Sequence, residues 1–453
     1  MGEYKSMVEA PTGWLGSIPE HWECKKIGSL FSERKTKVSD ADYPPLSVTK
    51  LGIVPQLANA AKSDSGDNRK LVCSGDFVIN SRSDRKGSCG VSELAGSVSL
   101  INIVLTPRNS WDNKYVHYLM RSQPFSEEYY HYGRGIVADL WTTRYSEMKN
   151  ILLPVPPHDE QEQIVRFLDW KVSGINKLIN IKKKEIERLC ELRNSTIDSG
   201  ILHGFHHGDM KSSGIYWLGD IPSTWEVMPI KRVAKINASV ADIVKVLNDE
   251  ELLTFLPMEN VSERGEIDCS IKRPLKEIKS GYSSFAKGDV VVAKITPCFE
   301  NGKGACLDTL DTEIGFGTTE FINLRPGDEI LSRYLYMITM TQHFRKLGER
   351  VMTGSAGQKR ISANYIKNFT LGIPAIKEQE KILKKLDSTL SKIDELIEIK
   401  KSEISGLHEL KNRLISDVVT GNIDVRDIEI PEYEFTDESA DSDLGDVDEE
   451  QED

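Results

Sequence analysis

The sequence has no long apolar run and no paired cysteines. No segment of its 453 residues approaches the roughly 20 consecutive apolar residues of a membrane span. The first residues also lack the basic-then-apolar pattern of a signal peptide. The seven cysteines are irregularly spaced and form no C-x-x-C pair, so neither a zinc site nor a disulfide framework is expected. We therefore expect a cytoplasmic protein with free thiols and no membrane contact.

The motifs that mark common enzymes are missing as well. The chain contains neither a G-x-x-x-x-G-K-[ST] phosphate loop nor a G-x-S-x-G nucleophile elbow. A methyltransferase acting on base amino groups needs an Asn/Asp-Pro-Pro-aromatic motif, which the residues Tyr43-Pro44-Pro45-Leu46 do not complete. The nuclease-like triplet Glu277-Ile278-Lys279 recurs as Glu398-Ile399-Lys400 inside a helical segment and is therefore uninformative. We expect no catalytic residue, no metal and no cofactor bound by this chain.

Acidic residues are concentrated at the C-terminal end. The net charge is −12, and residues 427–453 contain fourteen Asp or Glu and no Lys or Arg. Runs of like charge with few apolar residues tend to stay disordered, so we predict an acidic disordered tail over 424–453. The rest of the chain carries about +2, which is compatible with nucleic-acid binding through local basic patches despite a pI of 5.4.

A long internal repeat is the most informative feature present. The sequence W-L-G-S-I-P-E-H-W at 14–22 returns as W-L-G-D-I-P-S-T-W at 217–225, and E-Q-E at 160–162 returns at 378–380. A repeat of more than 200 residues is too long for a solenoid unit and indicates a duplicated domain followed by a helix. The blocks between these anchors, roughly 24–150 and 227–368, share little. This pattern favours a protein that holds two different ligands at a fixed separation.

The segments 158–202 and 376–420 carry apolar residues at alternating spacings of three and four, the a/d pattern of a coiled coil. Each would be a helix of about 65–70 Å. The predicted seam is Leu168, Val172, Ile175, Ile179, Lys182, Ile186 and Leu189 in the first segment and Leu386, Leu390, Ile393, Ile397, Lys400, Ile404 and Leu407 in the second. A duplicated domain-then-helix unit forming a pseudo-twofold within one chain predicts antiparallel packing. The alternative is two separate amphipathic helices, each lying on its own domain.

The predicted architecture is mixed α/β with five regions. These are a first globular domain (1–155), a first helix (156–204), a linker with a second globular domain (205–373), a second helix (374–423) and the tail (424–453). Residues 200–214, rich in glycine and histidine, are expected to be the linker itself. Within the domains we expect strands at 76–80, 98–105, 289–293 and 321–324, helices at 115–121 and 332–342, and proline-bounded strands at 151–157 and 369–374.

Both variable blocks contain basic, hydroxyl and amide side chains of the kinds that bind DNA. Lys, Arg and small hydroxyl groups hold phosphates, whereas Arg, Lys, Gln and Asn read base edges. For any single residue, an ordinary solvated surface position is the alternative. The candidates are Lys62, Arg69, Lys70, Arg82, Arg85, Lys86, Arg134, Thr143 and Arg144 in the first block and Lys294, Lys303, Thr318, Ser355, Gln358, Lys359 and Arg360 in the second.

These motifs together resemble the specificity subunit of Type I restriction–modification systems. The resemblance rests on the repeated W-L-G-x-I-P-x-x-W, on P-P-x-x-E-Q-E-Q-I at 156–164 and P-x-x-x-E-Q-E-K-I at 374–382, on the paired heptad segments and on G-S-A-G-Q-K-R-I-S at 354–362. It covers roughly residues 13–423, and the acidic tail lies outside it.

The resemblance implies a non-catalytic subunit with two target-recognition domains, each reading one half of a split, asymmetric site in double-stranded DNA. The two helices would form an antiparallel coiled coil that sets the spacing and docks two methyltransferase subunits. Those partners would use S-adenosylmethionine, and restriction/translocase subunits would join them where the system also cleaves DNA. The alternatives are a DNA methyltransferase or nuclease with unfamiliar motifs, or a coiled-coil scaffold that binds no DNA.

Overall fold

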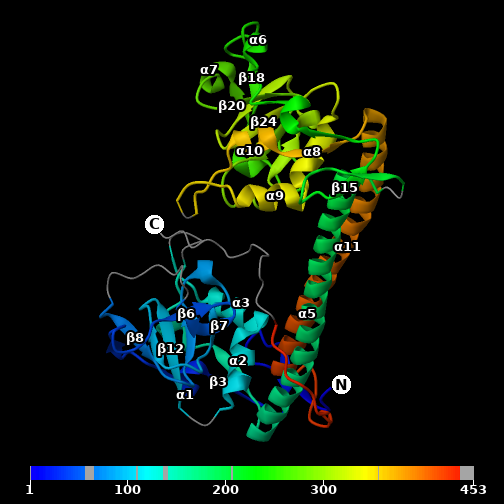
Figure 1. Cartoon of the computed structure of the whole chain (residues 1–453). Coiled ribbons are helices and arrows are strands. Elements are labelled where there is room, and N and C mark those ends of the chain that lie inside the picture. The colour runs from blue at the N-terminus through cyan, green and yellow to red at the C-terminus, as the bar shows by residue number, and fades with distance from the viewer. Residues whose placement is uncertain are drawn as a thin grey trace. The chain divides into compact units, whose positions relative to one another are not determined.

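The computed structural model describes residues 2–56, 66–108, 111–135, 141–205, 208–355 and 357–438. The chain divides into two compact units, which we call unit 1 (Met1–Lys184 with Lys401–Asp453) and unit 2 (Glu185–Lys400). Both contain helices and strands, so the predicted mixed α/β class is confirmed. The two long helices in Figure 1, α5 (His158–His203) and α11 (Ile376–Val419), each contribute residues to both units.

The centre of unit 1 is an antiparallel four-stranded sheet in the order β10-β9-β12-β4. Its strands are β4 (Phe31–Glu33), β9 (Phe77–Asn80), β10 (Cys89–Val91) and β12 (Asn102–Pro107). Phe77 and Ile79 point into one hydrophobic core and Val78 into another, as the alternation of side chains along a strand requires. The expected strand at 76–80 is therefore confirmed, whereas the one at 98–105 begins only at Asn102 because 99–102 form a turn.

Helix α2 (Asn113–Arg121) covers one side of this sheet and is followed by α3 (Gln123–His131). The Asp112 carboxylate begins α2 by accepting hydrogen bonds from the backbone N–H groups of Lys114 and Tyr115. The other elements of unit 1 are the strand pairs β1 (Met7–Glu9) with β2 (Ser17–Pro19), β3 (Glu23–Lys26) with β13 (Leu152–Val155) and β6 (Leu46–Thr49) with β7 (Gly52–Pro55), the sheet of β5 (Lys37–Val38), β8 (Arg69–Val72) and β11 (Gly96–Val98), and the short helices α1 (Ile27–Leu30), η1 (Ser83–Arg85) and α4 (Tyr145–Met148).

Unit 2 has a matching sheet in the order β17-β24-β21-β22 and a second sheet in the order β19-β18-β23-β20. The first contains β17 (Ala234–Ile236), β21 (Val290–Ala293), β22 (Gly304–Cys306) and β24 (Phe321–Pro326), and the second contains β18 (Leu252–Leu256), β19 (Lys272–Pro274), β20 (Ser283–Ala286) and β23 (Ile314–Gly317). Val290 and Val292 enter one core while Val291 and Ala293 enter another, so β21 is buried on both faces. The strands expected at 289–293 and 321–324 are confirmed.

Helix α8 (Ser332–Met340) packs on this sheet and ends two residues before the expected limit. The reason is Thr341, whose hydroxyl accepts a hydrogen bond from the Phe344 N–H and thereby begins a new helix, α9 (Gln342–Glu349). The remaining elements of unit 2 are β14 (Met210–Ser212) with β15 (Asp220–Pro222), β16 (Glu226–Pro229) with β25 (Thr370–Ile373), and the short helices η3 (Ile230–Arg232), α6 (Ala241–Val244), η4 (Met258–Asn260), α7 (Leu275–Ile278), η5 (Leu307–Thr309) and α10 (Ala363–Asn368).

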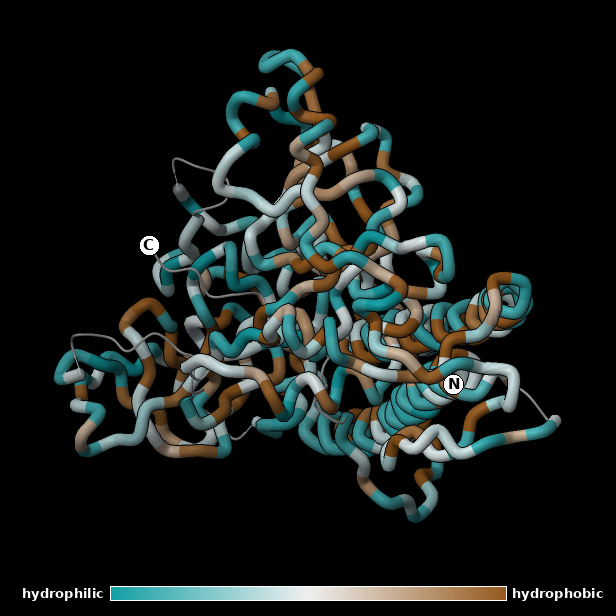
Figure 2. The backbone as a smooth tube through the Cα atoms, turned by 45° about the horizontal axis from the view of Figure 1, so that its top comes forward, coloured by the Kyte–Doolittle hydropathy of each residue, from teal (hydrophilic) through white to brown (hydrophobic). Residues whose placement is uncertain are grey.

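The long helices pair through charged side chains within each unit. In unit 1 the Lys182 ammonium lies 2.9 Å from Glu403, and in unit 2 Lys400 lies 3.3 Å from Glu185. Farther along α5, Arg193 pairs with Asp394, so the residue number falls on α11 as it rises on α5. All fourteen predicted seam residues are buried or half-buried. In Figure 2 the long helices carry both hydrophobic and hydrophilic residues, as this amphipathic pairing requires.

The C-terminal segment differs from the expectation of disorder. Val425 is fully buried in the core of unit 1, and the Gln163 amide on α5 donates hydrogen bonds to the carbonyls of Val425 and Ile428 at 3.0 and 2.9 Å. The prediction of a disordered tail is therefore wrong for 424–438, because apolar residues interleaved with the acids pack on unit 1. Residues 439–453 lie outside the described part of the chain.

The expected linker at 200–214 is also shorter than predicted. Helix α5 continues to His203, and Ile201 and Leu202 are buried in the core of unit 2. Strand β14, which lies in this segment, then pairs with β15 beyond it. The positions of His206 and His207 are outside the described residues.

Candidate nucleic-acid interface

In unit 1, the loop after β9 meets the segment that begins at Trp141. The backbone of Thr142 forms bridges with both Arg82 and Arg134. The Ser83 N–H donates to the Trp141 carbonyl at 2.9 Å, and the Trp141 N–H donates to the Ser83 hydroxyl at 3.0 Å. Two stretches that are about 60 residues apart in the sequence thus form one surface.

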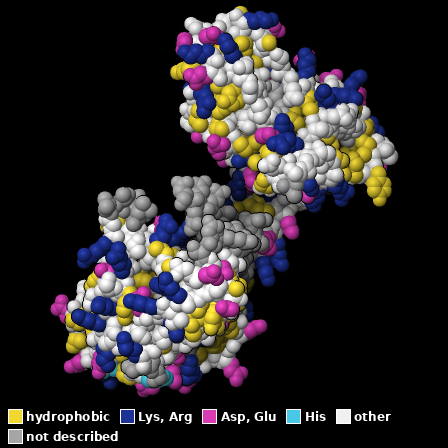
Figure 3. Space-filling view, turned by 90° about the vertical axis from the view of Figure 1, so that its left-hand side faces the viewer, with side chains coloured by type: hydrophobic (Ala, Val, Ile, Leu, Met, Phe, Trp, Pro, Cys, Tyr) yellow, Lys and Arg dark blue, Asp and Glu magenta, His cyan; other side chains and the backbone are white. Residues whose placement is uncertain are grey.

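Most basic candidates on this surface reach solvent. Arg134, Arg144 and Lys86 are exposed, and Arg82 and Arg85 are half-buried beside Asp84, which lies 3.0 Å from Arg82 and 3.9 Å from Arg85. The neighbouring indole of Trp141 is 38% exposed, which is unusual for so large an aromatic side chain. Figure 3 shows Lys and Arg side chains on the visible face of each unit. Such a basic and aromatic surface suits phosphate and base contacts.

Three candidates of the first block are structural instead. Arg69 is only 6% exposed, its guanidinium donates to the Ser97 hydroxyl and carbonyl, and burial lowers its pKa. The Lys70 ammonium donates to the Asn102 carbonyl at 2.7 Å, and the Thr143 hydroxyl donates to the Tyr129 carbonyl within the core. These three residues are poorly placed for contact with DNA, because pairing of β8 in its sheet turns Arg69 inward, Thr143 is 1% exposed and the Lys70 side chain is 15% exposed. Lys62 lies outside the described residues.

In unit 2, the loop after β21 meets the segment around Arg360. The backbone of Arg360 forms bridges with Ile295 and Thr353, and the Ile361 N–H donates to the Lys294 carbonyl at 2.8 Å. The two segments border a cavity of about 390 Å³. It is lined by Asn237, Ser283, Lys294, Thr319, Phe321, Ile322, Thr353, Arg360, Ile361, Ser362 and Ala363.

The Arg360 guanidinium is held by Glu320. Its Nε and Nη2 atoms donate to the Glu320 carboxylate at 3.0–3.2 Å, and these hydrogen bonds raise the pKa of Arg360. The Arg360 side chain nevertheless remains 43% exposed, so it faces solvent in a fixed orientation. A guanidinium held in this way is positioned to bind an anion or a base edge.

The other candidates of the second block fall into two groups. Ser355, Gln358 and Lys359 are exposed on the loop that leads to Arg360. Lys303 and Thr318 are half-buried, and the Thr318 hydroxyl accepts a hydrogen bond from the Glu320 N–H at 3.3 Å. The exposed loop and Arg360 are therefore the better placed residues for contact with a ligand.

Residues that the sequence analysis missed complete both surfaces. Asp84 and Glu320 are the acids that hold the arginines, and Asn237 lines the cavity in unit 2 with a positive φ of 53°. Asn is the residue type that adopts this conformation most readily after glycine, but nothing in the sequence around Asn237 marks it. A pattern of basic residues does not identify the acids that pair with them, so the sequence gives no signal for Asp84 or Glu320.

The backbone arrangement is the same in the two units. In unit 1 one residue, Thr142, bridges both Arg82 and Arg134, and in unit 2 Arg360 bridges both Ile295 and Thr353. The offsets along the sequence are 213 to 219, close to those of the repeat. The frame is therefore repeated, while the side chains that it presents differ.

Comparison with known proteins agrees with this organisation. Residues 222–406 match the model of the Type I restriction modification DNA specificity domain. The specificity subunit of the Type I restriction enzyme EcoAI of Escherichia coli is 39% identical over 180 residues, which are 39% of this chain and 30% of that protein. The MjaVIII specificity subunit of Methanocaldococcus jannaschii is 24% identical over 443 residues, covering 91% of this chain and 95% of that protein.

The chain is thus similar to Type I restriction specificity subunits, and residues 222–406 match their DNA specificity domain. The EcoEI specificity subunit of Escherichia coli is a further relative, 34% identical over 200 residues. The chain spans about a third of the length of the two Escherichia coli relatives that it matches.

The fold of the chain also has a solved counterpart. A chain from a study of complex assembly and conformational transition of the type I R-M system matches with a TM-score of 0.55 at 15% identity, covering 90% of this chain and 99% of that one. This likeness concerns the fold alone. Among the described residues, no three His, Cys, Asp or Glu side chains gather as metal ligands would, and no helix has the length and apolarity to cross a membrane.

Proposed function

We propose that this specificity subunit binds double-stranded DNA and that its two units read the different halves of a split, asymmetric site. The observation that carries the proposal is the repeated backbone frame at Thr142 and Arg360, which presents different side chains in each unit. A protein that recognises two different DNA sequences can bind both duplex segments with the same backbone arrangement, but it needs two different sets of base contacts. The match to a DNA specificity domain over 222–406 supports the same role.

The exposed basic residues divide between two tasks. Lys86, Arg134 and Arg144 in unit 1 and Lys359 in unit 2 are free to meet phosphates, which supply most of the affinity. Gln358 and Arg360 stand on the loop in unit 2 and carry the groups that bind adenine and guanine edges in the major groove. The globular domains at 1–155 and 205–373 are the proposed target-recognition domains.

We propose that α5 and α11 form an antiparallel coiled coil that sets the distance between the half-sites. The seam residues are buried or half-buried, and Lys182 and Lys400 pair with glutamates of the opposite helix. A polar residue at such a position fixes the register of a coiled coil. A stiff helix pair of fixed register is what a spacer requires.

The chain itself is proposed to be non-catalytic. Two methyltransferase subunits that use S-adenosylmethionine would supply the chemistry, and restriction subunits would join them in a system that also cleaves. The support is indirect: the relatives are named as specificity subunits of restriction enzymes.

The test is an exchange of recognition blocks. Residues 227–368 are replaced by the equivalent block of a relative, and the methylated sites are mapped in cells that contain the methyltransferase subunit. We expect one half-site to change and the other to stay the same. The matched control exchanges residues 24–150, which should change only the other half-site. A change in both half-sites from either exchange would refute the two-reader proposal.

Purified chain separates the alternatives. We expect the chain alone to retain duplex DNA in a sequence-dependent way. Methyl transfer or cleavage should occur only after a methyltransferase subunit is added. Methyl transfer or cleavage by the chain alone would establish an enzyme. Absence of DNA retention with and without the partner would establish a scaffold.

A further inference from the structure

The backbone frame shared by the two units identifies corresponding residues on their proposed recognition surfaces. In unit 1 the Ser83 N–H donates to the Trp141 carbonyl at 2.9 Å, and in unit 2 the Thr296 N–H donates to the Lys359 carbonyl at 3.0 Å. Each donor is the third residue after the end of the central strand, β9 in unit 1 and β21 in unit 2. Trp141 therefore occupies the position of Lys359.

Two further pairs of corresponding residues lie just before β12 in unit 1 and β24 in unit 2. Each of these strands pairs its first residue with the last residue of the central strand. Leu100, the second residue before β12, therefore corresponds to Thr319 before β24. Ile101 in the same way corresponds to Glu320.

The three positions are apolar and exposed in unit 1. Leu100 is 39% exposed, Ile101 37% and Trp141 38%. The Ser81 hydroxyl donates to the Ile101 carbonyl at 2.6 Å, and the Ser81 carbonyl accepts from the Thr143 N–H at 2.9 Å. The turn before β12 and the segment at Trp141 are thus joined through one residue of the loop after β9. A single exposed apolar side chain is ordinary, whereas three large ones on adjoining loops mark a contact surface.

The same positions are polar in unit 2. Thr319 and Lys359 are exposed, and the Glu320 carboxylate accepts hydrogen bonds from Arg360. Unit 2 thus presents hydroxyl, ammonium and guanidinium groups where unit 1 presents hydrocarbon. The two surfaces therefore suit different features of a base pair.

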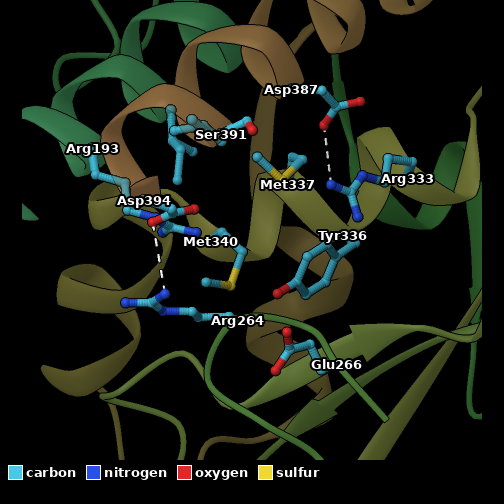
Figure 4. Close-up of a pocket in the computed structure, with 12 residues that line it drawn as sticks. Arg193, Arg264, Glu266, Arg333, Tyr336, Met337, Met340, Asp387, Ser391 and Asp394 are labelled. Atoms are coloured by element: carbon cyan, nitrogen blue, oxygen red, sulfur yellow. Dashed lines mark hydrogen bonds and ion pairs between the residues drawn. The ribbon is translucent and has the colours of Figure 1, made fainter. Parts of the chain in front are cut away.

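A further cavity of unit 2, of about 460 Å³, is separate from these loops (Figure 4). It is lined by residues of α5, α8 and α11 and of the loop at 264–266, and by none of the residues at 294–296, 318–320 or 353–362. Figure 4 shows Arg264 directed toward Asp394 and Arg333 directed toward Asp387. The exposed loops, rather than this cavity, form the proposed recognition surface of unit 2.

We propose that unit 1 recognises thymine in its half-site through contact of Leu100, Ile101 and Trp141 with the C5 methyl group. This inference rests on the proposed function, because it requires the surface of unit 1 to face the major groove. Thymine is the base that presents a methyl group there, whereas the other base edges present hydrogen-bonding groups. Apolar side chains would leave those groups without partners, which costs free energy, and they gain by covering a methyl group.

The residues around this apolar surface suit its position against DNA. Lys86, Arg134 and Arg144 are exposed, and Arg134 is joined by a backbone bridge to Thr142, next to Trp141. Cations at the edge of an apolar surface can hold phosphates while the centre meets the bases.

Apolar side chains can also enter DNA as wedges that separate base pairs. Two hydrogen bonds hold the Trp141 backbone to Ser83, and more than half of Leu100, Ile101 and Trp141 is covered by the protein. The three residues thus form a low surface rather than a projecting wedge, which favours contact with methyl groups.

The test replaces thymidine by deoxyuridine, which lacks only the C5 methyl group. Exchange of residues 24–150 identifies the half-site of unit 1, and competition binding to the full chain with the methyltransferase subunit then compares three duplexes. These are the natural site and the site with deoxyuridine in one half or in the other. In the half-site of unit 1, deoxyuridine should weaken binding about three- to tenfold for each methyl group contacted. The loss from the other half-site should be smaller.

A double variant links this loss to the apolar surface. Leu100→Ser combined with Ile101→Ser should bind the thymidine and deoxyuridine duplexes alike, because the hydrocarbon that covers the methyl group is gone. Leu94→Ser is the matched control, since Leu94 is also 37% exposed but lies in the turn between β10 and β11. That turn follows Val91, which pairs with Phe77 at the opposite end of β9 from the recognition loop. Leu94→Ser should keep the full sensitivity to deoxyuridine.

Several results would overturn the proposal and leave the reading of half-sites intact. These are a half-site of unit 1 without an A·T pair, equal binding of the natural and deoxyuridine duplexes by the wild-type chain, and undiminished sensitivity in the double variant. Weaker binding of the double variant to every duplex, with no effect of deoxyuridine on the wild-type chain, would indicate a wedge and overturn it equally. A wild-type chain that binds no duplex would refute the proposed function and this inference together.

Discussion

Replacing Glu438 by glutamine should release the C-terminal segment from unit 1. Glu438 pairs with Lys411 at 2.6 Å, with His408 at 2.8 Å and with Lys183 at 3.3 Å. Burial alone would raise the pKa of Glu438, but hydrogen bonds and charge from Lys411 and His408 outweigh it and lower the pKa to about 2. The neutral amide of Glu438→Gln keeps the size of the side chain and removes this attraction.

The magnitude follows from the pKa difference. A carboxyl whose pKa falls from 4.5 to about 2 on folding gains at most about 3 kcal/mol, at 1.36 kcal/mol per unit. Because the Glu438 side chain is still 26% exposed, solvent screening reduces this value, and we expect about 1–2 kcal/mol. The pKa is depressed in the folded state, so the stabilisation is complete above pH 4.5 and is lost as the pH falls toward about 2.

Hydrogen exchange of the backbone at 427–438 measures the opening of this segment directly. At pH 7 Glu438→Gln should lower the protection of these amides about five- to thirtyfold, and the difference from the wild-type chain should shrink as the pH falls below 4.5. Glu432→Gln is the matched control, because it removes the same charge from an exposed position. Equal loss of protection in both variants, or a difference that does not depend on pH, would show that net charge rather than the Glu438 contacts holds the tail.

Three further predictions concern recognition and spacing. Glu320→Gln should release Arg360 and strengthen binding to all duplexes severalfold. The ratio of specific to non-specific affinity, measured by competition binding, should fall. Lys359→Ala should weaken binding to every DNA sequence and reduce the slope of log K against log salt by about one, as measured by titration with salt. Arg69→Ala should instead lower the free energy of unfolding by about 1–3 kcal/mol, as measured by urea titration, and leave the sequence preference unchanged. Inserting four helical residues within Asn194–Gly200 should lengthen the gap between half-sites by roughly two base pairs, and an unchanged gap in mapped sites would remove the spacer role.

Local pattern was sufficient for the regular elements of the fold. The valine run at 290–293 is buried on both faces as expected, and the heptad spacing marked α5 and α11 to within a few residues at their ends. The break between α8 and α9 was missed because it depends on Thr341, whose hydroxyl caps the start of α9. This single hydrogen bond determines whether one helix continues or a second one begins. Periodicity carries no information about such a choice.

The tail shows where composition misleads. Net charge predicted disorder, but Ile428 and Ile430 alternate with acids closely enough for an extended segment to pack one side against the core. The ordered conformation of the tail is stabilised by the Ser173 and Gln163 side chains, which form hydrogen bonds with its backbone and lie about 260 residues away in the sequence. A signal of this kind becomes visible only when the two segments are compared in space.

The candidate residues for DNA contact were predicted less well, for a related reason. Thr143 and Arg144 are neighbours in the sequence, yet Thr143 is 1% exposed and Arg144 is exposed. Which of two adjacent side chains faces solvent depends on the pairing of distant strands and loops, such as the bridge from Thr142 to Arg82. Residue type and clustering single out loops without ranking the residues within them.

The turns at Gly75-Asp76 and Gly288-Asp289 explain how the two units can share a backbone arrangement while their proposed DNA-binding surfaces differ. Asp76 and Asp289 are both almost fully buried, and each accepts a hydrogen bond at 2.8 Å from the backbone N–H three residues earlier. The compensating guanidinium differs in origin, since Arg34 follows β4 whereas Arg325 belongs to β24. The carboxylate–backbone bond fixes the turn before the central strand. The cation reaches the same buried charge from the adjacent strand β24 in unit 2 and from the end of β4, one strand farther away, in unit 1. Selection on the frame therefore leaves the loop beyond that strand free to change, which is where we expect the half-site preference of each unit to be encoded.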